Sequence, residues 1–542
     1  MQPVIIGVAD IKNRSVAVKD AKEPADLILE AINSAIRDAS DRPETASRLR
    51  SSIDSISVVR TWTWDYPDLP GLLSLHLGIN PGHQVYSDHG GNQPAKLLDE
   101  AALRLATGDS KVAVLTGGEA LASLASCVKE KKMPPTGWSR PSKSVKDHGF
   151  RAHRGQSVSE NHEESAFLYA NFSQVAARNP YAWNYGHDAE TMKSIGTVSK
   201  RNRIICLPCI TSLLHLTVVI LLICVADPLL MNAFNTVNLA AACVLTTTEY
   251  AQQLQIPKDK WIYPLSGAGY KDSDYFWERP NFFESPSVSK SLDQCLSSSQ
   301  IDRDEIDLYD FYSCFPIVPK LACHHLGLSI TEPAKPITVL GGLTSFGGAG
   351  NNYSMHAITE MVRQLRQGVG RNGIILANGG VLSYQHAICI SSQPRRNNSP
   401  YPDSNALRNV VKEFVPVIDI EAEGKAIIET YTVEFHRDGS PMRACVVGRL
   451  IDNQHRFIAN DGDHSTLQLL GSTSDEQIGK VWIGWAYAIW FAKRAKEKMP
   501  QTILYGLGNK EVTSTLSEDL EVRTCPSMKA LFLQRHVSEE EK

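Results

Sequence analysis

The chain has 542 residues, of which 55 are basic and 59 acidic, so its formal net charge is −4. This length exceeds one small domain and predicts two domains with a sizeable insertion. The near balance of charge excludes the broad basic surface that nucleic acids require, so no nucleic-acid partner is expected.

The 11 cysteines have no regular spacing of the kind found in secreted disulfide scaffolds, which indicates a reducing compartment. Cys206 and Cys209 form a Cys-x-x-Cys pair with no second ligand pair nearby, so no metal site is expected. The chain begins at once with a predicted strand, Val4–Ala9, and no secretory signal is expected. The ending Glu539–Lys542 is not a peroxisomal targeting tripeptide, which favours a cytoplasmic location and leaves a peroxisomal one as the alternative.

Strands and helices alternate through the first 120 residues. Apolar residues recur at helical spacing between Pro24 and Ser40, and the apolar runs on either side, Val4–Ala9 and Ile53–Arg60, are predicted strands. A helix at Leu69–Leu77 follows. This alternation predicts an α/β layered domain with buried, largely parallel strands.

A glycine turn at His89–Asn92 opens a predicted helix, Gln93–Ala106, which leads into a strand, Lys111–Thr116, and a glycine pair. The same unit recurs about 260 residues later. There, Gly341–Asn352 opens the predicted helix Tyr353–Arg366, and this helix is followed by the strand Gly373–Asn378 and the pair Gly379 and Gly380.

Glycine lets the backbone approach a ligand closely, and a helix N-terminus offers unpaired N–H groups to an oxygen atom. Two copies of the unit therefore predict a duplicated α/β fold in which two helix N-termini face one site. Such a geometry is suited to an acyl group or an oxyanion.

Between the two copies, residues 128 to 234 interrupt the alternation and are interpreted as a loop region. This region includes an apolar run at 209–227, whose continuous apolar core, Val218–Ala226, is nine residues long. A membrane-spanning helix needs about 20 residues, so membrane association is not expected.

Alternation resumes near Asn235 and continues to about residue 393. We predict four further elements here: a helix at Leu239–Leu245, a strand at Trp261–Leu265, a helix at Ser287–Ser298 and a strand at Ile306–Asp310. Residues 394–411 are a linker by composition. Beyond it, an alternating hairpin at Ala426–Phe435 and Met442–Ile451 predicts a small β-barrel-like domain, whose tail after residue 482 is unassigned.

Six motifs carry a resemblance to a known family: Pro3–Gly7, His89–Asn92, Gly118–Ala120, Tyr312–Phe315, Gly341–Asn352 and Asn378–Gly380. With these, the chain resembles the thiolase superfamily, most closely the thiolase-like proteins of the sterol-carrier-protein-thiolase (acetyl-CoA acetyltransferase) branch that have an additional C-terminal domain. The resemblance implies two thiolase halves, 1–127 and 235–393, packed as a five-layered αβαβα core, with the additional domain at 412–542. It also implies a coenzyme A thioester as ligand and no separate cofactor.

Active thiolases use two cysteines, a histidine and an asparagine or histidine. By the resemblance, the first cysteine falls on His89 or Gly90, the histidine on Gly348, the second cysteine on Ala377 and the asparagine on Tyr312. Claisen chemistry needs a thiolate to hold the acyl group and a base to move an α-proton. The resemblance therefore implies acyl-CoA binding by a degenerate active site that lacks ordinary thiolysis.

Two other functions stay open. An acyltransferase of altered mechanism could use His89 with Cys314 or Tyr312, although each of these side chains also has a purely structural interpretation. A non-enzymatic carrier could instead recruit a partner through its C-terminal domain. The oligomeric state is not determined by the sequence.

The candidate substrate-binding residues are the glycines and asparagines of the turns together with one histidine: Gly90, Gly91, Asn92, Gly347, Gly348, Asn351, Asn352, His356, Asn378, Gly379 and Gly380. The asparagines before the two helices could equally cap them, and His356 could be a packing histidine one turn into its helix. In similar proteins the strand Arg203–Pro208 leads almost directly to Pro228, so 209–227 is interpreted as an insertion that arises from a translated intron.

Overall fold

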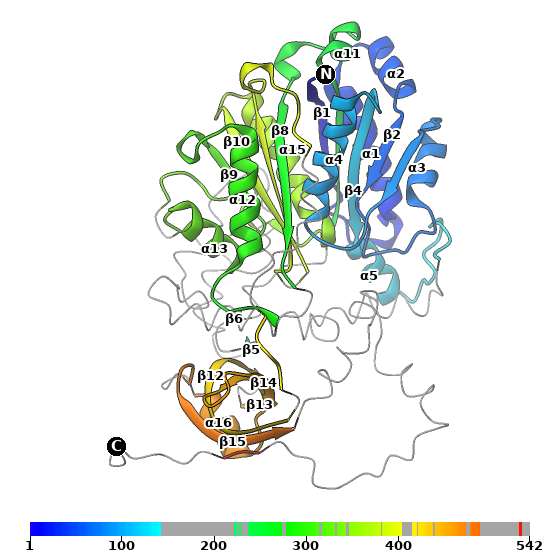
Figure 1. Ribbon diagram of the computed structural model, residues 1–542. Helices are drawn as coiled ribbons and strands as arrows, with labels where there is room; N and C mark the ends of the chain where they lie inside the picture. Colours follow the sequence, from blue (N-terminus) through cyan, green and yellow to red (C-terminus); the bar gives the residue numbers. More distant parts are fainter. Residues whose placement is uncertain are drawn as a thin grey trace.

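The computed structural model describes residues 1–142, 222–224, 227–228, 237–273, 278–313, 317–330, 333–342, 346–380, 382–403, 415–419, 421–436, 440–472, 477–487 and 531–533. Two α/β halves lie side by side, and a smaller β domain lies at one end of them (Figure 1). Most of the predicted loop region, Cys314, and residues 404–411 of the linker lie outside the described residues.

The first half contains a five-stranded sheet with the order β1-β7-β4-β2-β3. These strands are β1 (Pro3–Lys12), β7 (Asn238–Thr247), β4 (Val112–Ala120), β2 (Ser55–Val58) and β3 (His83–Tyr86). Strand β2 is parallel to β4 and β3, whereas β7 is antiparallel to both β1 and β4.

The prediction of largely parallel strands is confirmed for the first 120 residues. Because β1 and β4 are both antiparallel to β7, they run in the same direction as β2 and β3, and β7 alone in this sheet is reversed. Strand β7 follows the long loop region rather than a short helical crossover. The helix predicted at Leu239–Leu245 is wrong, because these residues belong to β7. Every residue of β7 is buried, so the strand lacks the alternation that would distinguish it from a helix.

The second half contains a four-stranded sheet with the order β8-β11-β10-β9. These strands are β8 (Tyr263–Lys271), β11 (Tyr384–Ser391), β10 (Asn372–Gly379) and β9 (Leu308–Phe311). Strands β9 and β10 are parallel, and β11 is antiparallel to both of its neighbours.

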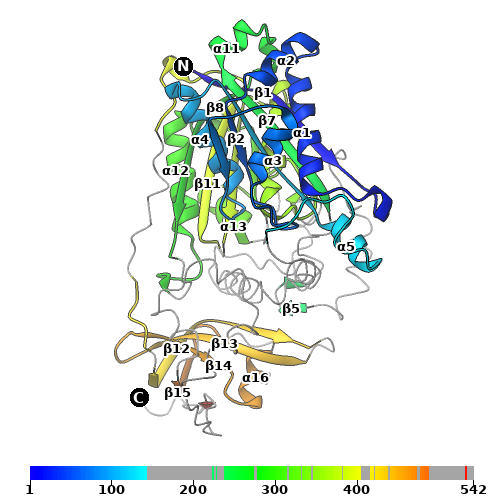
Figure 2. The same ribbon diagram turned by 90° about the vertical axis from the view of Figure 1, so that its right-hand side faces the viewer.

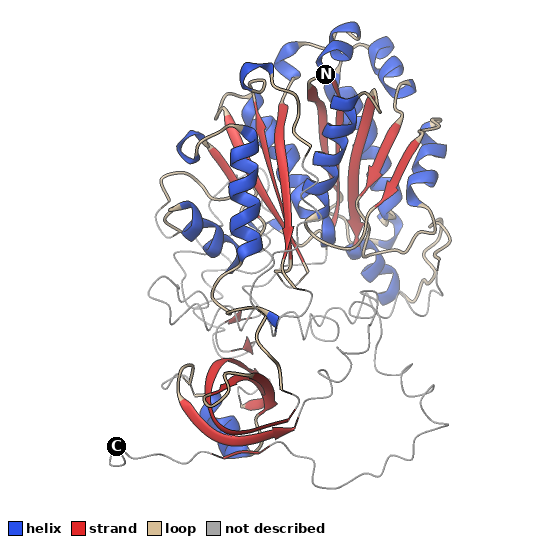
Figure 3. Ribbon diagram, viewed as in Figure 1, coloured by secondary structure: helices blue, strands red, loops and turns tan. Residues whose placement is uncertain are grey.

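The five-layered αβαβα arrangement is confirmed (Figures 1 and 3). Helices α4 (Gln93–Thr107) and α15 (Tyr353–Arg366) form the middle layer, and their buried side chains share one apolar cluster with both sheets. The outer layer of the first half is α1 (Pro24–Ala39), α2 (Pro43–Ser51) and α3 (Leu69–Leu77). The outer layer of the second half is α12 (Pro286–Ser299) and α13 (Ile317–Leu326).

Two shorter helices directly follow strands of the first sheet: α5 (Leu121–Lys129) continues from β4, and α11 (Thr248–Gln253) continues from β7. The 3₁₀ helices are η1 (Val18–Asp20), η3 (Lys258–Lys260), η5 (Arg303–Glu305), η6 (Gly350–Asn352) and η7 (Arg396–Asn398). Helix η6 leads directly into α15, so the second glycine turn is continuous with the start of the middle-layer helix.

The C-terminal domain is an antiparallel five-stranded sheet with the order β14-β13-β12-β15-β16, and helix α16 (His464–Leu470) packs against it (Figure 2). Its strands are β12 (Glu421–Phe435), β13 (Pro441–Leu450), β14 (Arg456–Asn460), β15 (Val481–Tyr487) and β16 (Leu531–Leu533). The predicted hairpin is confirmed as β12 and β13.

A segment of the second half anchors this domain. Phe282, which precedes α12, is 3% exposed and belongs to the apolar cluster of the C-terminal domain. The guanidinium group of Arg456 lies 4.8 Å from the centre of the Phe282 ring and donates hydrogen bonds to the backbone carbonyls of Arg279 and Pro280. Glu429 accepts a hydrogen bond from Arg456 at 2.5 Å, so the buried cation is paired.

Strands β5 (Leu222–Cys224) and β6 (Asp227–Pro228) form a short antiparallel pair, and the rest of the predicted insertion lies outside the described residues. Among the helices of the described ranges, none is long and apolar enough to cross a bilayer.

Candidate functional site

The turn before α4 is in direct contact with the end of β10. Gly379, the last residue of β10, lies so close to this turn that a Cβ atom at this position would be 2.5 Å from Asn92 Oδ1 and 3.1 Å from the Gly91 amide nitrogen. A Cβ atom on Gly91 would meet the carbonyl oxygen of Asn378 and lie 2.7 Å from Tyr312 Cε1. Because neither position has room for a side chain, both residues must be glycine for this contact to form.

Asn351 connects this contact to α15. It is 3% exposed, and its Oδ1 accepts a hydrogen bond of 3.1 Å from the amide of Gly90 across 261 residues of sequence. Its Nδ2 donates to the carbonyl of Arg60 at 3.0 Å and lies 3.2 Å from Nδ1 of His89. The starts of α4 and α15 are therefore joined through one side chain.

Asn92 and Asn352 occupy the N-cap positions of α4 and α15, but neither side chain makes a capping hydrogen bond, so the capping interpretation is wrong. Their Oδ1 atoms are buried and have no hydrogen-bond partner within the described part of the chain. An unpaired buried acceptor is costly, and a ligand with an amide or hydroxyl donor would satisfy it.

His89 is exposed at the mouth of this site. The ring of Trp62 lies edge-on to the His89 ring, with 6.0 Å between their centres and an interplanar angle of 90°. Because the Asn351 amide is a donor, His89 Nδ1 accepts from it, which places the proton of the neutral ring on Nε2.

Tyr312 lies beneath the turns within a group of aromatic rings. Its ring centre is 5.0 Å from that of Tyr353, which in turn lies 5.7 Å from Phe346. The Tyr312 hydroxyl donates a hydrogen bond of 3.4 Å to the carbonyl of Gly350. Tyr312 is 8% exposed, so it mainly fills the space below the contact between the turns. Cys314, the other candidate at this motif, lies outside the described residues.

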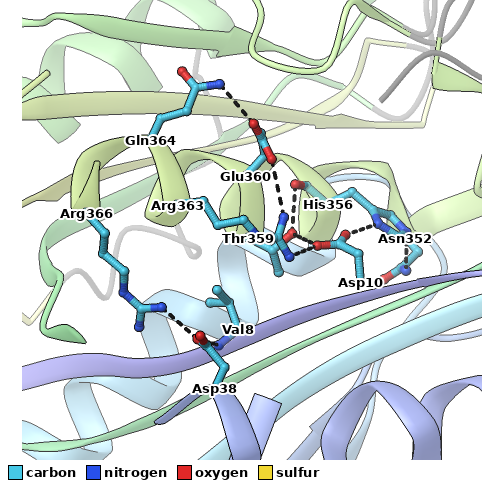
Figure 4. Close-up of polar contacts among 10 residues, drawn as sticks. All are labelled: Val8, Asp10, Asp38, Asn352, His356, Thr359, Glu360, Arg363, Gln364 and Arg366. Atoms are coloured by element: carbon cyan, nitrogen blue, oxygen red, sulfur yellow. Dashed lines mark hydrogen bonds and ion pairs between the residues drawn. The ribbon is translucent and has the colours of Figure 1, made fainter. Parts of the chain in front are cut away.

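His356 is fully buried away from the mouth (Figure 4). Its Nδ1 lies 2.5 Å from Asp10 Oδ1, and its Nε2 lies 3.4 Å from Asn352 Nδ2. Asp10 also accepts hydrogen bonds from Thr359 and Arg363. Burial lowers the pKa of His356. Burial by itself would raise the pKa of Asp10, but the hydrogen bonds and charges of His356 and Arg363 lower it strongly. The cluster joins β1 to α15, so the structure gives His356 a packing position.

Three further glycines shape the turns. Gly347 and Gly380 have φ angles of 101° and 63°, a left-handed conformation that residues with a Cβ atom rarely adopt. Gly348 is buried immediately before α15. Glycine permits these backbone conformations. The second turn then contacts the first through the hydrogen bond from Gly90 to Asn351.

Sequence reasoning did not select Glu119, which lies beside the site at the end of β4. Its carboxylate accepts hydrogen bonds from the amides of Trp62 and Thr63, at 2.7 and 2.9 Å, and from the Thr63 hydroxyl at 2.5 Å. Burial raises the pKa of Glu119 to about 7. The motif Gly118–Ala120 could have identified Glu119 from the sequence. A carboxylate is unusual directly after a buried strand and a glycine pair.

The described cysteines do not supply a nucleophile. Those with described surroundings are free and buried, and burial raises the thiol pKa of each: Cys127, Cys243, Cys295, Cys323 and Cys389. A nucleophilic cysteine requires a lowered pKa and access to substrate. Within the described ranges, no cluster of three or more His, Cys, Asp or Glu residues could hold a metal ion.

Residues 407–485 match the family model of the thiolase-like protein type 1 additional C-terminal domain. A solved monomeric SCP2-thiolase-like protein type 1 from Mycobacterium smegmatis is 27% identical, with a TM-score of 0.62, and the match covers 90% of this chain and 97% of that protein. No curated protein matches the chain.

Two more distant structures share the fold. The Ltp2-ChsH2(DUF35) aldolase is 17% identical with a TM-score of 0.51, and the match covers 73% of this chain and 99% of that one. Human mitochondrial 3-ketoacyl-CoA thiolase is 12% identical with a TM-score of 0.50. The match covers 72% of this chain and 99% of that one. Together with the layers, the two joined glycine turns and the matched C-terminal domain, these similarities identify the chain as a thiolase-like protein with an additional C-terminal domain.

Proposed function

We propose that this protein binds an acyl-CoA or a related coenzyme A thioester where the two glycine turns meet, and that it does not catalyse ordinary thiolysis. The observation that supports binding is the hydrogen bond from the Gly90 amide to Asn351 Oδ1, which brings the two glycine turns together at one place, beside the end of β10. Backbone N–H groups at helix N-termini favour a carbonyl oxygen that carries negative charge. The unpaired Oδ1 atoms of Asn92 and Asn352 are acceptors that suit the amide groups of the coenzyme A arm.

The absence of thiolysis follows from the residues at the four catalytic positions. Gly348 and Ala377 have no group that could hold an acyl chain or move a proton. Tyr312 replaces the asparagine, and its hydroxyl is already bonded to a backbone carbonyl. His89 is the one titratable group among them at the mouth, and a base without a nucleophile does not complete the reaction.

The runner-up, an acyltransferase of altered mechanism, rests on the proton that the neutral His89 ring carries on Nε2 and on Cys314. The third function, a carrier that recruits a partner through its C-terminal domain, is the remaining alternative.

The test is calorimetric titration with acetyl-CoA of the wild-type protein and of the variants Gly90→Trp and Gly348→Trp. Both variants add an indole to one of the two turns, and both should abolish binding. A Cβ atom on Gly90 would already lie 2.5 Å from Asn92 Oδ1, and Gly348 is buried. Gly82→Trp is the matched control, since nothing lies within 4 Å of a Cβ atom there. Unchanged affinity in both turn variants would remove the ligand from this site.

A further inference from the structure

The buried carboxylate of Glu119 binds the loop between β2 and α3 to the end of β4. It accepts three hydrogen bonds from Trp62 and Thr63, and the Thr63 hydroxyl itself accepts one of 3.0 Å from the amide of Ala120. Thr63 is 2% exposed, so this contact is closed to water. The Glu119 carboxylate is therefore one of the contacts that position this loop, together with the hydrogen bonds of Thr61 to Tyr86 and of the Arg60 carbonyl to Asn351.

This loop carries the outer wall of the candidate site. Trp62 is 45% exposed, and its ring lies edge-on to His89 at the mouth. Glu119 also lies against the second glycine turn, since a Cβ atom on Gly350 would be 2.6 Å from Glu119 Oε1 and 3.1 Å from Trp62 Cδ1. Three segments that are far apart in sequence meet around Glu119: the loop, the end of β4 and the turn before α15.

Glu119 forms no ion pair within the described ranges. Hydrogen bonds from Trp62 and Thr63 are what stabilise its negative charge. Tyr86, whose hydroxyl lies 3.0 Å from that of Thr61, and His89 are the nearest titratable side chains on the neighbouring segments. Arg60 lies over the Tyr86 ring at 4.4 Å and donates to the carbonyl of Ser87.

We propose that Glu119 is a positioning residue for coenzyme A thioester binding: its buried carboxyl group accepts the hydrogen bonds that hold Trp62 against His89 and thereby sets the wall of the mouth. This inference rests on the proposed function and assigns a role to a residue that does not touch the ligand. Burial raises the pKa of Glu119 to about 7, above that of a solvated carboxyl group, so the held position favours the protonated form and ionisation near neutral pH favours release of the loop.

The first experiment needs no ligand. Acrylamide quenching of tryptophan fluorescence is measured in the wild-type protein and in Trp62→Phe, and the difference reports Trp62 alone. The same pair is then measured with Glu119→Gln added. Release of the loop should increase the quenching of Trp62. Unchanged quenching would overturn the proposal, whether or not the protein binds coenzyme A.

The second experiment titrates coenzyme A calorimetrically between pH 6 and pH 8. Wild-type affinity should fall as the pH rises through about 7, because ionisation makes the buried, desolvated position of Glu119 less favourable than a released one. Glu119→Gln, whose amide nitrogen cannot accept a hydrogen bond, should bind about tenfold more weakly at pH 6, the size of about one lost hydrogen bond, and without this pH dependence. A wild-type profile in Glu119→Gln would overturn the proposal.

Asp272→Asn is the matched control. Asp272 is also a buried carboxylate with a raised pKa, but its partners are Ser285 and Ser287 at the start of α12 in the outer layer. This variant should keep the wild-type profile. If wild-type protein binds no coenzyme A at any pH, the proposed function fails, and the quenching experiment still decides the role of Glu119.

If Glu119→Gln does not fold, Thr63 provides the same test. Thr63→Ser keeps the hydroxyl that donates to Glu119 and should retain both the quenching and the pH profile. Thr63→Val has the same shape without the donor and should show increased Trp62 quenching. Equal behaviour of the two variants would overturn the proposal.

Discussion

Replacing Gly91 by alanine adds one methyl group at the place where the turn before α4 meets the end of β10. The new Cβ atom would lie 2.7 Å from Tyr312 Cε1 and would also meet the carbonyl oxygen of Asn378. The carbonyl belongs to β10, and the Tyr312 ring is 8% exposed and packed against Tyr353, so neither neighbour can move freely. We therefore expect the turn before α4 to be forced away from β10 and Tyr312.

Forcing an extra methyl group into a well-packed site costs about 1–3 kcal/mol. The φ angle of Gly91 is not in the left-handed region, so backbone strain adds nothing and the whole effect comes from packing. Each kcal/mol lowers the melting temperature by about 2–4 °C in domains of 150–250 residues, so the thiolase core should melt several degrees lower. Acetyl-CoA affinity should fall as well, because the turn before α4 carries the proposed site.

The assay is differential scanning calorimetry of Gly91→Ala beside Gly82→Ala. Gly82 also has an ordinary φ angle, and nothing lies within 4 Å of a Cβ atom there, so its variant should remain within about 0.5 kcal/mol of the wild type. Equal melting temperatures for the two variants would show that the turn before α4 does not meet β10 and Tyr312 as described.

Three further outcomes are expected. Thiolysis of acetoacetyl-CoA should stay at background in a spectrophotometric assay, and turnover that His89→Ala abolishes would contradict this and favour the acyltransferase alternative. Phe282→Ala should destabilise the C-terminal domain by about 3–5 kcal/mol in urea unfolding, whereas its neighbour Phe283, which is 37% exposed, should tolerate alanine; equal effects would refute the anchor. Burial raises the pKa of Glu119 from 4.5 to about 7, so the folded protein binds more protons than the unfolded one between these values. The contribution of Glu119 to stability should then fall as the pH rises through that window. Glu119→Gln should remove this fall from a plot of melting temperature against pH, and an unchanged plot would contradict the prediction.

Local pattern alone determined much of the fold. The helical spacing and the glycine boundaries predicted α15 at Tyr353–Arg366, which is its observed range, and located α4 and the β12–β13 hairpin to within a few residues. These elements are amphipathic or alternate strictly, so their periodicity is a direct record of which side faces the core. The glycine turns were also visible in the sequence, because few other residues suit a close backbone approach.

The tertiary structure decided what local pattern does not record. Strand β7 is covered on both faces, so its sequence has no alternation and was predicted as a helix. The hydrogen bond from Gly90 to Asn351 and the contact of Gly91 with Tyr312 join residues more than 200 positions apart, and no local rule predicts such pairs. His356 matched the spacing of a mouth residue, yet Asp10 from another strand holds it in the core. Sequence therefore determined the elements and the turns, whereas the packing of the two halves decided which side chains face a ligand.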